Sequence, residues 1–290
     1  MELPFGAVAL KIQGYDFGAN TNFELLTKIN QSGLGHGFSM SEWILTLNGK
    51  NSQFVWSDSE FLHSILLLSG TLNLNFFNRE GTLTSIKLSA TETDGLKFFK
   101  CSNMQNVFIS CGGDLSKAIL LSSNLKASSV STCNSSIQVT FNPNLHQDIL
   151  RSEGCCVGVD QFTLESLKIQ ATNSRLQRSR LCIHRDDQEL LHEMFIHFNG
   201  PAAFPASYHL RRSESITILR GKLRCRIFST DGKSSAEIPL SGSYEEGVTD
   251  DYNYLFIPKE IPHEFFFDSH EIITKETTLG PFDPKETVML

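Results

Sequence analysis

The sequence has no long apolar run. Although 40% of its 290 residues are hydrophobic, no stretch reaches the roughly 18 consecutive apolar residues that a membrane-spanning helix needs. The segment Met1–Leu10 also lacks the basic part and the apolar core of a secretory signal peptide. We therefore expect a cytoplasmic protein with no membrane partner.

Basic residues are scarce, since the chain carries a net charge of −7. This charge argues against binding to nucleic acid or to an anionic membrane surface. Arginine is scarcest in residues 1–150, where Arg79 is the only one, whereas ten of the eleven arginines lie in residues 151–290. Because arginine binds phosphate and carboxylate groups well, the second half is a candidate for handling an anion. The alternative is that some of these arginines only cover a strand.

Cysteine pairs and nucleotide-binding loops are absent as well. The seven cysteines are odd in number and form no C-x-x-C pair, which is typical of reduced thiols in a cytosolic protein. The sequence has no G-x-S-x-G elbow, no phosphate-binding loop and no G-x-G-x-x-G after a strand. Neither a serine hydrolase nor a dinucleotide-binding enzyme is supported.

What the sequence does contain is alternation of polar and apolar residues. Residues 71–76 and 222–227 both alternate in this way, which predicts half-buried antiparallel strands. Turn sequences such as Thr230-Asp231-Gly232 recur between such runs. Many short strands with regular turns indicate a β-sandwich or a β-barrel. Helices are expected at residues 186–194 and, less clearly, at residues 23–29.

The pattern occurs twice, at an offset of 151 residues. The segment from His63 to Gly70 aligns with the segment from Glu214 to Gly221, and the strands that follow align at the same offset. A strand, a turn and a second strand repeated at one offset predict two similar β domains. We place them at residues 1–150 and 151–290, with the boundary somewhere between residues 145 and 175.

Two segments of the second half have the spacing of one metal site. His209 is followed by Glu214 and by Gly221, and His263 comes five residues after Pro258. Imidazole nitrogens and a carboxylate form an open site for iron(II), and they also suit zinc, nickel or manganese. The alternative is a pair of hydrogen-bonded histidines at the mouth of a barrel. A buried lone carboxylate is costly, however, and this cost favours a metal or a nearby arginine beside Glu214.

These motifs resemble those of the cupin superfamily, whose pattern joins His-x-His, Glu and Gly to a distant Pro and His. Three further blocks resemble the WbuC-like cupin-fold metalloproteins that occur with bacterial surface-polysaccharide genes: Arg178–His184, Glu214–Gly221 and Glu276–Phe282. The resemblance covers about residues 175–285. It implies an all-β bicupin: two tandem double-stranded β-helix, or jelly-roll, barrels with a few short helices.

The chain also departs from the cupin pattern. Ser207 stands where the family has its first metal-binding histidine, and Glu260 replaces a glycine of the second motif. In the first half, His63 stands where Glu214 would be, Asp58 where His209 would be, and Asn106 roughly where His263 would be. We therefore expect a degenerate first barrel and a second barrel that binds a divalent metal through His209, Glu214 and His263.

Three more residues are candidates for binding a substrate. Arg220 has the same strand parity as Glu214, so it faces the pocket if the strand is regular, and Arg211 is close in sequence. Tyr254 is an aromatic candidate for the pocket wall, whereas Phe265 and Phe267 are better explained as barrel packing. The same alternation predicts that Tyr208 points away from the side that carries His209.

The resemblance implies a role in O-antigen or capsule synthesis, but cupins include enzymes of many kinds and pure binding modules. One hypothesis is an enzyme, of sugar isomerase or epimerase type, that acts on a nucleotide-activated sugar and uses His209 or His263 as a base or metal ligand, with Glu214. The second hypothesis is a binding or assembly module that forms a homodimer. The third is an iron(II)-dependent oxygenase.

Overall fold

We analysed a computed structural model of the 290-residue chain. The residues that the structure describes are 8–10, 21–31, 38–49, 52–56, 61–77, 83–90, 96–104, 107–123, 149–151, 156–200, 203–229, 235–242 and 251–290. Within them the chain is almost entirely β-strand, which confirms the predicted all-β fold class. None of the helices described is both long enough and apolar enough to cross a membrane.

The chain divides into two compact units. The N-terminal unit holds residues 15–139 and 153–164, and the C-terminal unit holds residues 1–14, 140–152 and 165–290. The sequence predicts a single boundary between residues 150 and 151, whereas each compact unit includes segments from both sides of that boundary. The strand at residues 8–10, which precedes that boundary, and the strand at residues 149–151, which spans it, both belong to the C-terminal unit.

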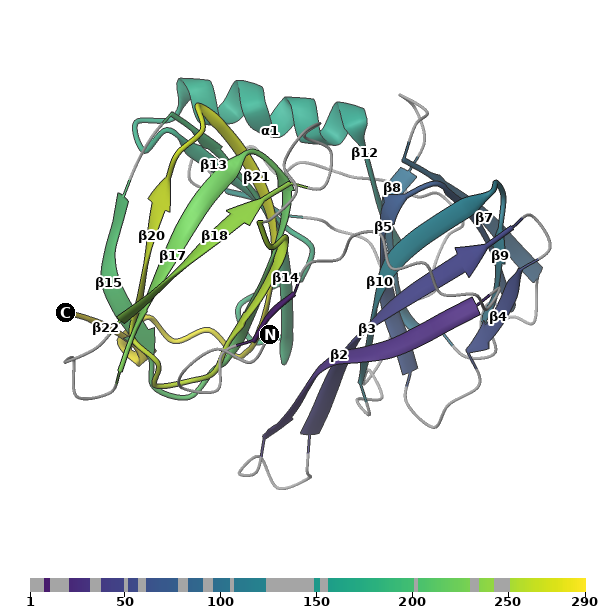
Figure 1. The fold of residues 1–290 in the computed structure, drawn as a ribbon, viewed down its shortest axis with the longest axis horizontal. Helices are drawn as coiled ribbons and strands as arrows, with labels where there is room; N and C mark the ends of the chain where they lie inside the picture. The colour runs from purple at the N-terminus through teal and green to yellow at the C-terminus, as the bar shows by residue number, and fades with distance from the viewer. Residues whose placement is uncertain are drawn as a thin grey trace. The chain divides into compact units, whose positions relative to one another are not determined.

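The C-terminal unit contains two sheets that form one barrel, drawn in green and yellow in Figure 1. The first sheet has the strand order β1 (Val8–Leu10), β19 (Tyr254–Ile257), β16 (Glu214–Arg220), β21 (Glu271–Leu279), β14 (Leu191–Asn199), β13 (Arg178–Cys182) and β11 (Ile149–Arg151). The second has the order β18 (Ser235–Ser241), β17 (Lys222–Phe228), β20 (His263–Phe267), β15 (Ala203–His209) and β22 (Thr287–Met289).

Alternation along the strands builds the core of this barrel. The side chains of Ile216 and Ile218 from one sheet meet those of Leu223, Cys225 and Ile227 from the other in a single buried apolar cluster. Between these positions, Arg224 and Arg226 point outward and pair with acidic residues on the solvent side of β17. The period-two pattern of residues 222–227 is therefore confirmed as a half-buried strand.

The N-terminal unit contains one long sheet. Its strands, in sheet order, are β2 (Thr21–Gln31), β3 (Phe38–Asn48), β10 (Leu115–Ser123), β5 (Phe61–Ser69), β8 (Leu96–Met104), β7 (Leu83–Ser89), β6 (Thr71–Phe77), β9 (Val107–Cys111) and β4 (Gln53–Trp56), and β12 (Cys156–Asp160) pairs with β8. The buried cluster inside it is almost wholly apolar and includes Trp56, Leu62 and Phe76.

The 151-residue repeat is present in the structure. Gly70 joins β5 to β6 and Gly221 joins β16 to β17, and both have a positive φ, +80° and +86°. A Cβ atom would lie 2.0 Å from the carbonyl oxygen of Leu115 at the first position and 2.2 Å from that of Glu271 at the second. Glycine is therefore required twice for the same reason, a left-handed turn pressed against a neighbouring backbone.

The two helix predictions are wrong. Residues 23–29 lie in β2, which pairs with β3 along its length. Residues 186–190 form turns, and β14 begins at Leu191. Side chains on both faces of β14 are buried, including Phe195 at 1% exposure and Ile196 at 5%. A strand that is buried on both faces has no polar face, so its sequence shows no alternation.

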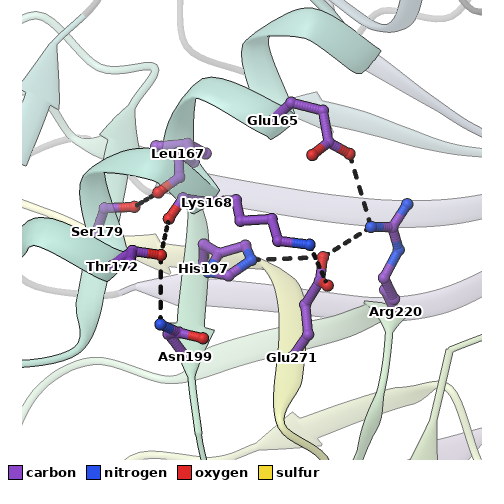
Figure 2. Close-up of polar contacts among 9 residues, drawn as sticks. All are labelled: Glu165, Leu167, Lys168, Thr172, Ser179, His197, Asn199, Arg220 and Glu271. Carbon is purple, nitrogen blue, oxygen red and sulfur yellow. Dashed lines mark hydrogen bonds and ion pairs between the residues drawn. The ribbon is translucent and has the colours of Figure 1, made fainter.

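The one α-helix described, α1 (Gln161–Asn173), was not predicted. It begins after Asp160, whose carboxylate accepts hydrogen bonds from the backbone N–H and the hydroxyl of Thr163. Its later turns lie against the outer face of β13 and β14, where Ser179 Oγ donates to the carbonyl oxygen of Leu167 at 2.6 Å, as Figure 2 shows. An Asp followed three residues later by Thr is the signal that could have located this helix.

Candidate metal centre

Three strands bring the predicted ligands to one end of the C-terminal barrel. His209 ends β15, Glu214 begins β16, and His263 begins β20. Backbone hydrogen bonds hold the short connection between the first two, since Leu210 N donates to Glu286 O at 2.9 Å and Glu260 N donates to His209 O at 2.7 Å. The positions of the ligands are thus set by the sheet and by the chain segments beside it.

The three ligands converge. One ligand atom from each of His209, Glu214 and His263 lies within 4.8 Å of the others. His263 Nε2 is 2.9 Å from Glu214 Oε1, and His209 Nε2 is 3.5 Å from Glu214 Oε2. Both imidazole rings therefore present Nε2 to the same carboxylate, which is the arrangement that the sequence spacing predicted.

The opposite ring nitrogens have partners of their own. His263 Nδ1 lies 3.0 Å from the carbonyl oxygen of Ile261, which can only accept, so Nδ1 carries the proton. His209 Nδ1 lies 3.1 Å from Thr287 Oγ1, which can donate or accept, and 3.3 Å from Arg212 Nη2, which can only donate. Histidines that bind a metal through Nε2 usually donate Nδ1–H to such a partner, which fixes the ring orientation.

The donor atoms of this site fit a metal. Glu214 Oε1 is buried and lies 2.9 Å from His263 Nε2. When both rings are neutral with the proton on Nδ1, the Nε2 lone pairs and the carboxylate oxygens are all acceptors that face one another. A cation between them satisfies all of these atoms, and two imidazoles with one carboxylate are a suitable donor set for a divalent transition metal.

The pKa shifts in the site also favour a positive charge beside Glu214. Burial alone would raise the pKa of Glu214, but His263 and His209 lower it well below its usual range. Burial alone would lower the pKa of His263, but the adjacent Glu214 carboxylate raises it above the ordinary histidine value. The carboxylate therefore stays ionised and attracts positive charge, either a proton on His263 or a metal ion.

Glu276 is a residue of this region that the sequence analysis missed. In the pairing of β16 with β21, Ile216 is opposite Glu276 and Glu214 is opposite Thr278. Both glutamates are therefore on the inner face, at pairing positions two residues apart along the strands. Burial raises the pKa of Glu276, and the negative charge of Glu214 raises it further. The positive charges of Arg180 and Arg212 partly offset this increase. The even-numbered residues of β21 face inward, so parity within residues 271–279 was the signal that could have found it.

Ser207 occupies the place that the motif alignment gave it. It is directly opposite His263 in the pairing of β15 with β20, where a histidine would face the same centre. The cupin pattern thus aligns with the structure at this position, and the C-terminal barrel offers three protein ligands where the pattern has four. Three protein ligands leave coordination positions open for water or substrate.

Arg220 does not face this centre, and the expected inward orientation is wrong. A β-bulge between Ile218 and Arg220 shifts the register with β21, so the parity shared with Glu214 is lost. The guanidinium lies on the outer face, 2.7 Å from Glu271 and 3.7 Å from Glu165 of α1 (Figure 2). Lys168 of the same helix binds Glu271 at 2.8 Å, so this cluster attaches α1 to the barrel.

Tyr254 and Arg211 also lie outside the convergence of ligands. The odd-numbered residues Leu255 and Ile257 of β19 belong to the inner core. The even-numbered Tyr254 is therefore on the other face of this strand, where it is fully buried. The side chain of Arg211 is 76% exposed and lies 3.7 Å from Glu286. Phe267 belongs to the core cluster with Phe265 packed against it, which agrees with their interpretation as barrel packing.

In the N-terminal unit, His63 is the one predicted counterpart that the structure describes. It lies in a bulge between Leu62 and Ser64 of β5, and its Nε2 is 2.6 Å from Ser123 Oγ. Asp58 and Asn106 fall outside the described residues. No cluster of three possible metal ligands other than the one at His209 occurs among the residues described.

Comparison with known proteins agrees with this fold. A family model described as a domain of unknown function, DUF6016, matches residues 159–240, and no curated protein matches the sequence. Among solved structures, a cupin 2 conserved barrel protein from Leptotrichia buccalis superimposes with a TM-score of 0.50 at 10% identity and covers 88% of each chain.

Oxalate decarboxylase structures superimpose as well. One has a TM-score of 0.50 at 10% identity over 95% of this chain and 81% of that chain. That of Lactobacillus farciminis has a TM-score of 0.48 at 8% identity over 96% of this chain and 90% of that one. At such low identity these similarities concern the fold alone. The chain has the cupin fold, in the two-barrel form that its internal repeat predicts.

Proposed function

We propose that the C-terminal barrel binds a divalent transition metal through His209 Nε2, Glu214 and His263 Nε2, and that the chain uses this centre on a small molecule. The observation that supports this most directly is the convergence of His209, Glu214 and His263, whose ligand atoms all lie within 4.8 Å of one another. A metal bound there would supply a Lewis acid with open coordination positions. Iron(II), manganese, zinc and nickel all accept this donor set.

The residues of this chain would prepare the centre. Ile261 O accepts the Nδ1 proton of His263, and Thr287 Oγ1 and Arg212 Nη2 contact His209 Nδ1, so both rings are held with Nε2 directed at Glu214. Burial keeps bulk water from Glu214, whose relative exposure is 5%. The iron(II)-dependent oxygenase hypothesis uses the same three ligands and stays open.

The role in surface-polysaccharide synthesis stays a prediction from the WbuC-like resemblance. That hypothesis assigned the substrate phosphates of a nucleotide sugar to Arg220, which instead pairs with Glu271 on the outer face of the barrel. A nucleotide-sugar substrate therefore has no support from the position of this arginine. Binding of a small molecule at the metal itself does not depend on Arg220.

Metal binding can be tested on the full-length chain. The purified protein is treated with a chelator and titrated with Zn(II), Mn(II), Ni(II) and, without oxygen, Fe(II), with calorimetry and elemental analysis as readouts. We expect binding of one metal ion per chain. Glu214→Gln keeps the shape of the side chain but loses its charge, and it should weaken binding by about 100-fold or more, since each tenfold loss corresponds to about 1.4 kcal/mol.

The matched control is Glu237→Gln, which removes an exposed carboxylate from the outer face of the same barrel, where it pairs with Arg224. Thermal unfolding of both variants shows whether they remain folded. The proposal is wrong if the wild-type protein binds none of the four metals, or if the two variants bind metal equally well.

A further inference from the structure

Two arginines whose charges act on Glu276, Arg212 and Arg180, form no ion pair with a carboxylate among the described residues. Six other arginines in the described part of the chain pair with carboxylates at N–O distances of 2.5–3.7 Å: Arg151, Arg185, Arg211, Arg220, Arg224 and Arg226. No such ion pair forms at Arg212 or Arg180 within those residues. Both have a buried Nε atom that makes no hydrogen bond there.

Arg212 is nevertheless almost completely buried, with 9% of its surface exposed. Its Nη2 lies 3.2 Å from Thr287 Oγ1 and 3.3 Å from His209 Nδ1, so it sits directly beside a ligand of the candidate metal. The ring of Phe282 covers the guanidinium, whose central carbon is 5.0 Å from the ring centroid. The buried Nε of Arg212 has no acceptor among the described residues, and an anion from outside the protein could supply one.

Arg180 and Glu276 extend this region along the inner face. In the register of β13 with β14, Arg180 pairs with Ile196 and Cys182 pairs with Met194, and Met194 in turn pairs with Glu276. Glu276 is half-buried. The charges of Arg180 and Arg212 act on it, but no hydrogen bond or ion pair at Glu276 is found among the described residues. An ionisable carboxyl inside a barrel without a protein partner calls for a hydrogen-bond partner from a ligand or from water.

The charge balance also favours an anion. A divalent metal held by two neutral imidazoles and one carboxylate keeps a net charge of about +1. Arg212 and Arg180 add positive charge beside it, and Glu276 offsets only part of that sum. An unpaired guanidinium offers two parallel N–H donors, whose geometry matches a carboxylate or a phosphate.

We propose that the mouth of the C-terminal barrel is a subsite for a small hydroxycarboxylate, whose carboxylate binds Arg212 and whose hydroxyl group hydrogen-bonds to Glu276 beside the metal. The open coordination positions can take an oxygen of the same molecule. This inference rests on the proposed metal site for its third contact, whereas Arg212 and Glu276 are not themselves among the three metal ligands. Inorganic phosphate shares the oxyanion chemistry but lacks the carbon-bound hydroxyl group.

The test compares three probes, glycolate, acetate and inorganic phosphate, by calorimetric titration of the full-length protein with and without metal. We expect glycolate to bind the metal-loaded protein at least tenfold more tightly than acetate, and more tightly than phosphate. Arg212→Gln should weaken glycolate and acetate alike by tenfold or more. Glu276→Gln should reduce the preference for glycolate over acetate to less than twofold while leaving acetate binding unchanged.

The control is Arg226→Gln, which removes a paired arginine from the outer face of β17 and should leave every titration unchanged. Metal content is measured in the same samples, so a loss of anion binding at full metal content is separate from a failure of the metal site. If the chain binds no metal, weaker glycolate binding that still depends on Arg212 supports the subsite. Glycolate binding that is absent, weaker than phosphate binding, or unaffected by Arg212→Gln overturns the proposal.

Discussion

The two barrels have the same strand pairing at their mouths but opposite chemistry. In the C-terminal barrel the end of β15 pairs Ser207 with His263, whereas in the N-terminal barrel the end of β4 pairs Trp56 with Val107. Trp56 is 2% exposed and packs edge-on against Trp43, with ring centroids 6.3 Å apart. An indole thus occupies the position where the other barrel has a serine beside a metal ligand.

This difference shows that the same barrel backbone can carry either a stable apolar core or a polar binding site. The core of the N-terminal barrel is built mainly from apolar side chains, which stabilise the fold by burial, although the buried polar residue His63 stands at the position of Glu214. The mouth of the C-terminal barrel contains two glutamates, two histidines and two arginines that gain nothing comparable from burial. Its polar groups are satisfied in full only by a ligand, so we expect binding there and stability in the other barrel.

The largest effect is expected for Trp56→Ala, which empties the mouth of the N-terminal barrel. Loss of a buried tryptophan leaves a cavity, and the free energy of unfolding should fall by about 3–5 kcal/mol. Denaturant unfolding measures this change, and calorimetry should show unchanged metal affinity. A fall in metal affinity that matches the fall in stability would contradict the division of roles between the barrels.

The next effect tests the shared turn. Gly70→Ala and Gly221→Ala each place a Cβ atom within 2.2 Å of a backbone carbonyl oxygen at a positive φ. We expect each variant to lose about 2–4 kcal/mol of stability, because strain and overlap add. Similar losses of stability in the two variants would show that the two turns have the same energetic requirement for glycine as well as the same geometry. As a control, Gly113→Ala meets no atom within 4 Å and should cost much less.

A smaller effect is expected for Ser207→His, which restores the fourth ligand of the cupin pattern. The new imidazole would lie opposite His263, and metal affinity should rise by about tenfold, or about 1.4 kcal/mol. Metal titration of the variant measures this. Unchanged affinity would mean that the centre does not lie on the side of the barrel to which Ser207 points.

The smallest effect concerns Glu271 on the outer face. Burial alone would raise its pKa, but Lys168 and Arg220 lower it to about 2. A carboxyl whose pKa falls on folding stabilises the protein above its unfolded pKa of about 4.5, and this contribution disappears as the pH falls towards 2. Glu271→Gln should therefore cost about 1–2 kcal/mol at neutral pH and little near pH 2, measured by denaturant unfolding at both pH values.

Much of the fold was accessible from the sequence because the barrels repeat. The offset of 151 residues predicted two similar β domains, and the spacing of His209, Glu214 and His263 predicted ligands that do converge. Local periodicity was a weaker guide. It failed at residues 186–194, since a strand that is buried on both faces has the same apolar spacing as a helix.

The residues that the sequence analysis misplaced depend on irregularities or on distant chain segments. Arg220 faces outward because of one bulge, and strand parity cannot predict where a bulge falls. Arg212 owes its position to Thr287 and Phe282, which are about 70 residues away in the sequence. Glu276 was accessible by parity, but only once the direction of β21 in the barrel was known.

The strand β1 has a consequence for how the chain is made. It pairs with β19, so Val8 lies opposite Phe256 and Leu10 opposite Tyr254, and nearly the whole sequence separates the partners. Because β19 is synthesised long after β1 and contacts between such distant residues form slowly, their pairing is expected to be late. Until β1 pairs with it, the edge of β19 can pair with another chain. A gene cut between the two barrels would leave that edge open permanently, so the second barrel should be expressed with the start of the chain attached.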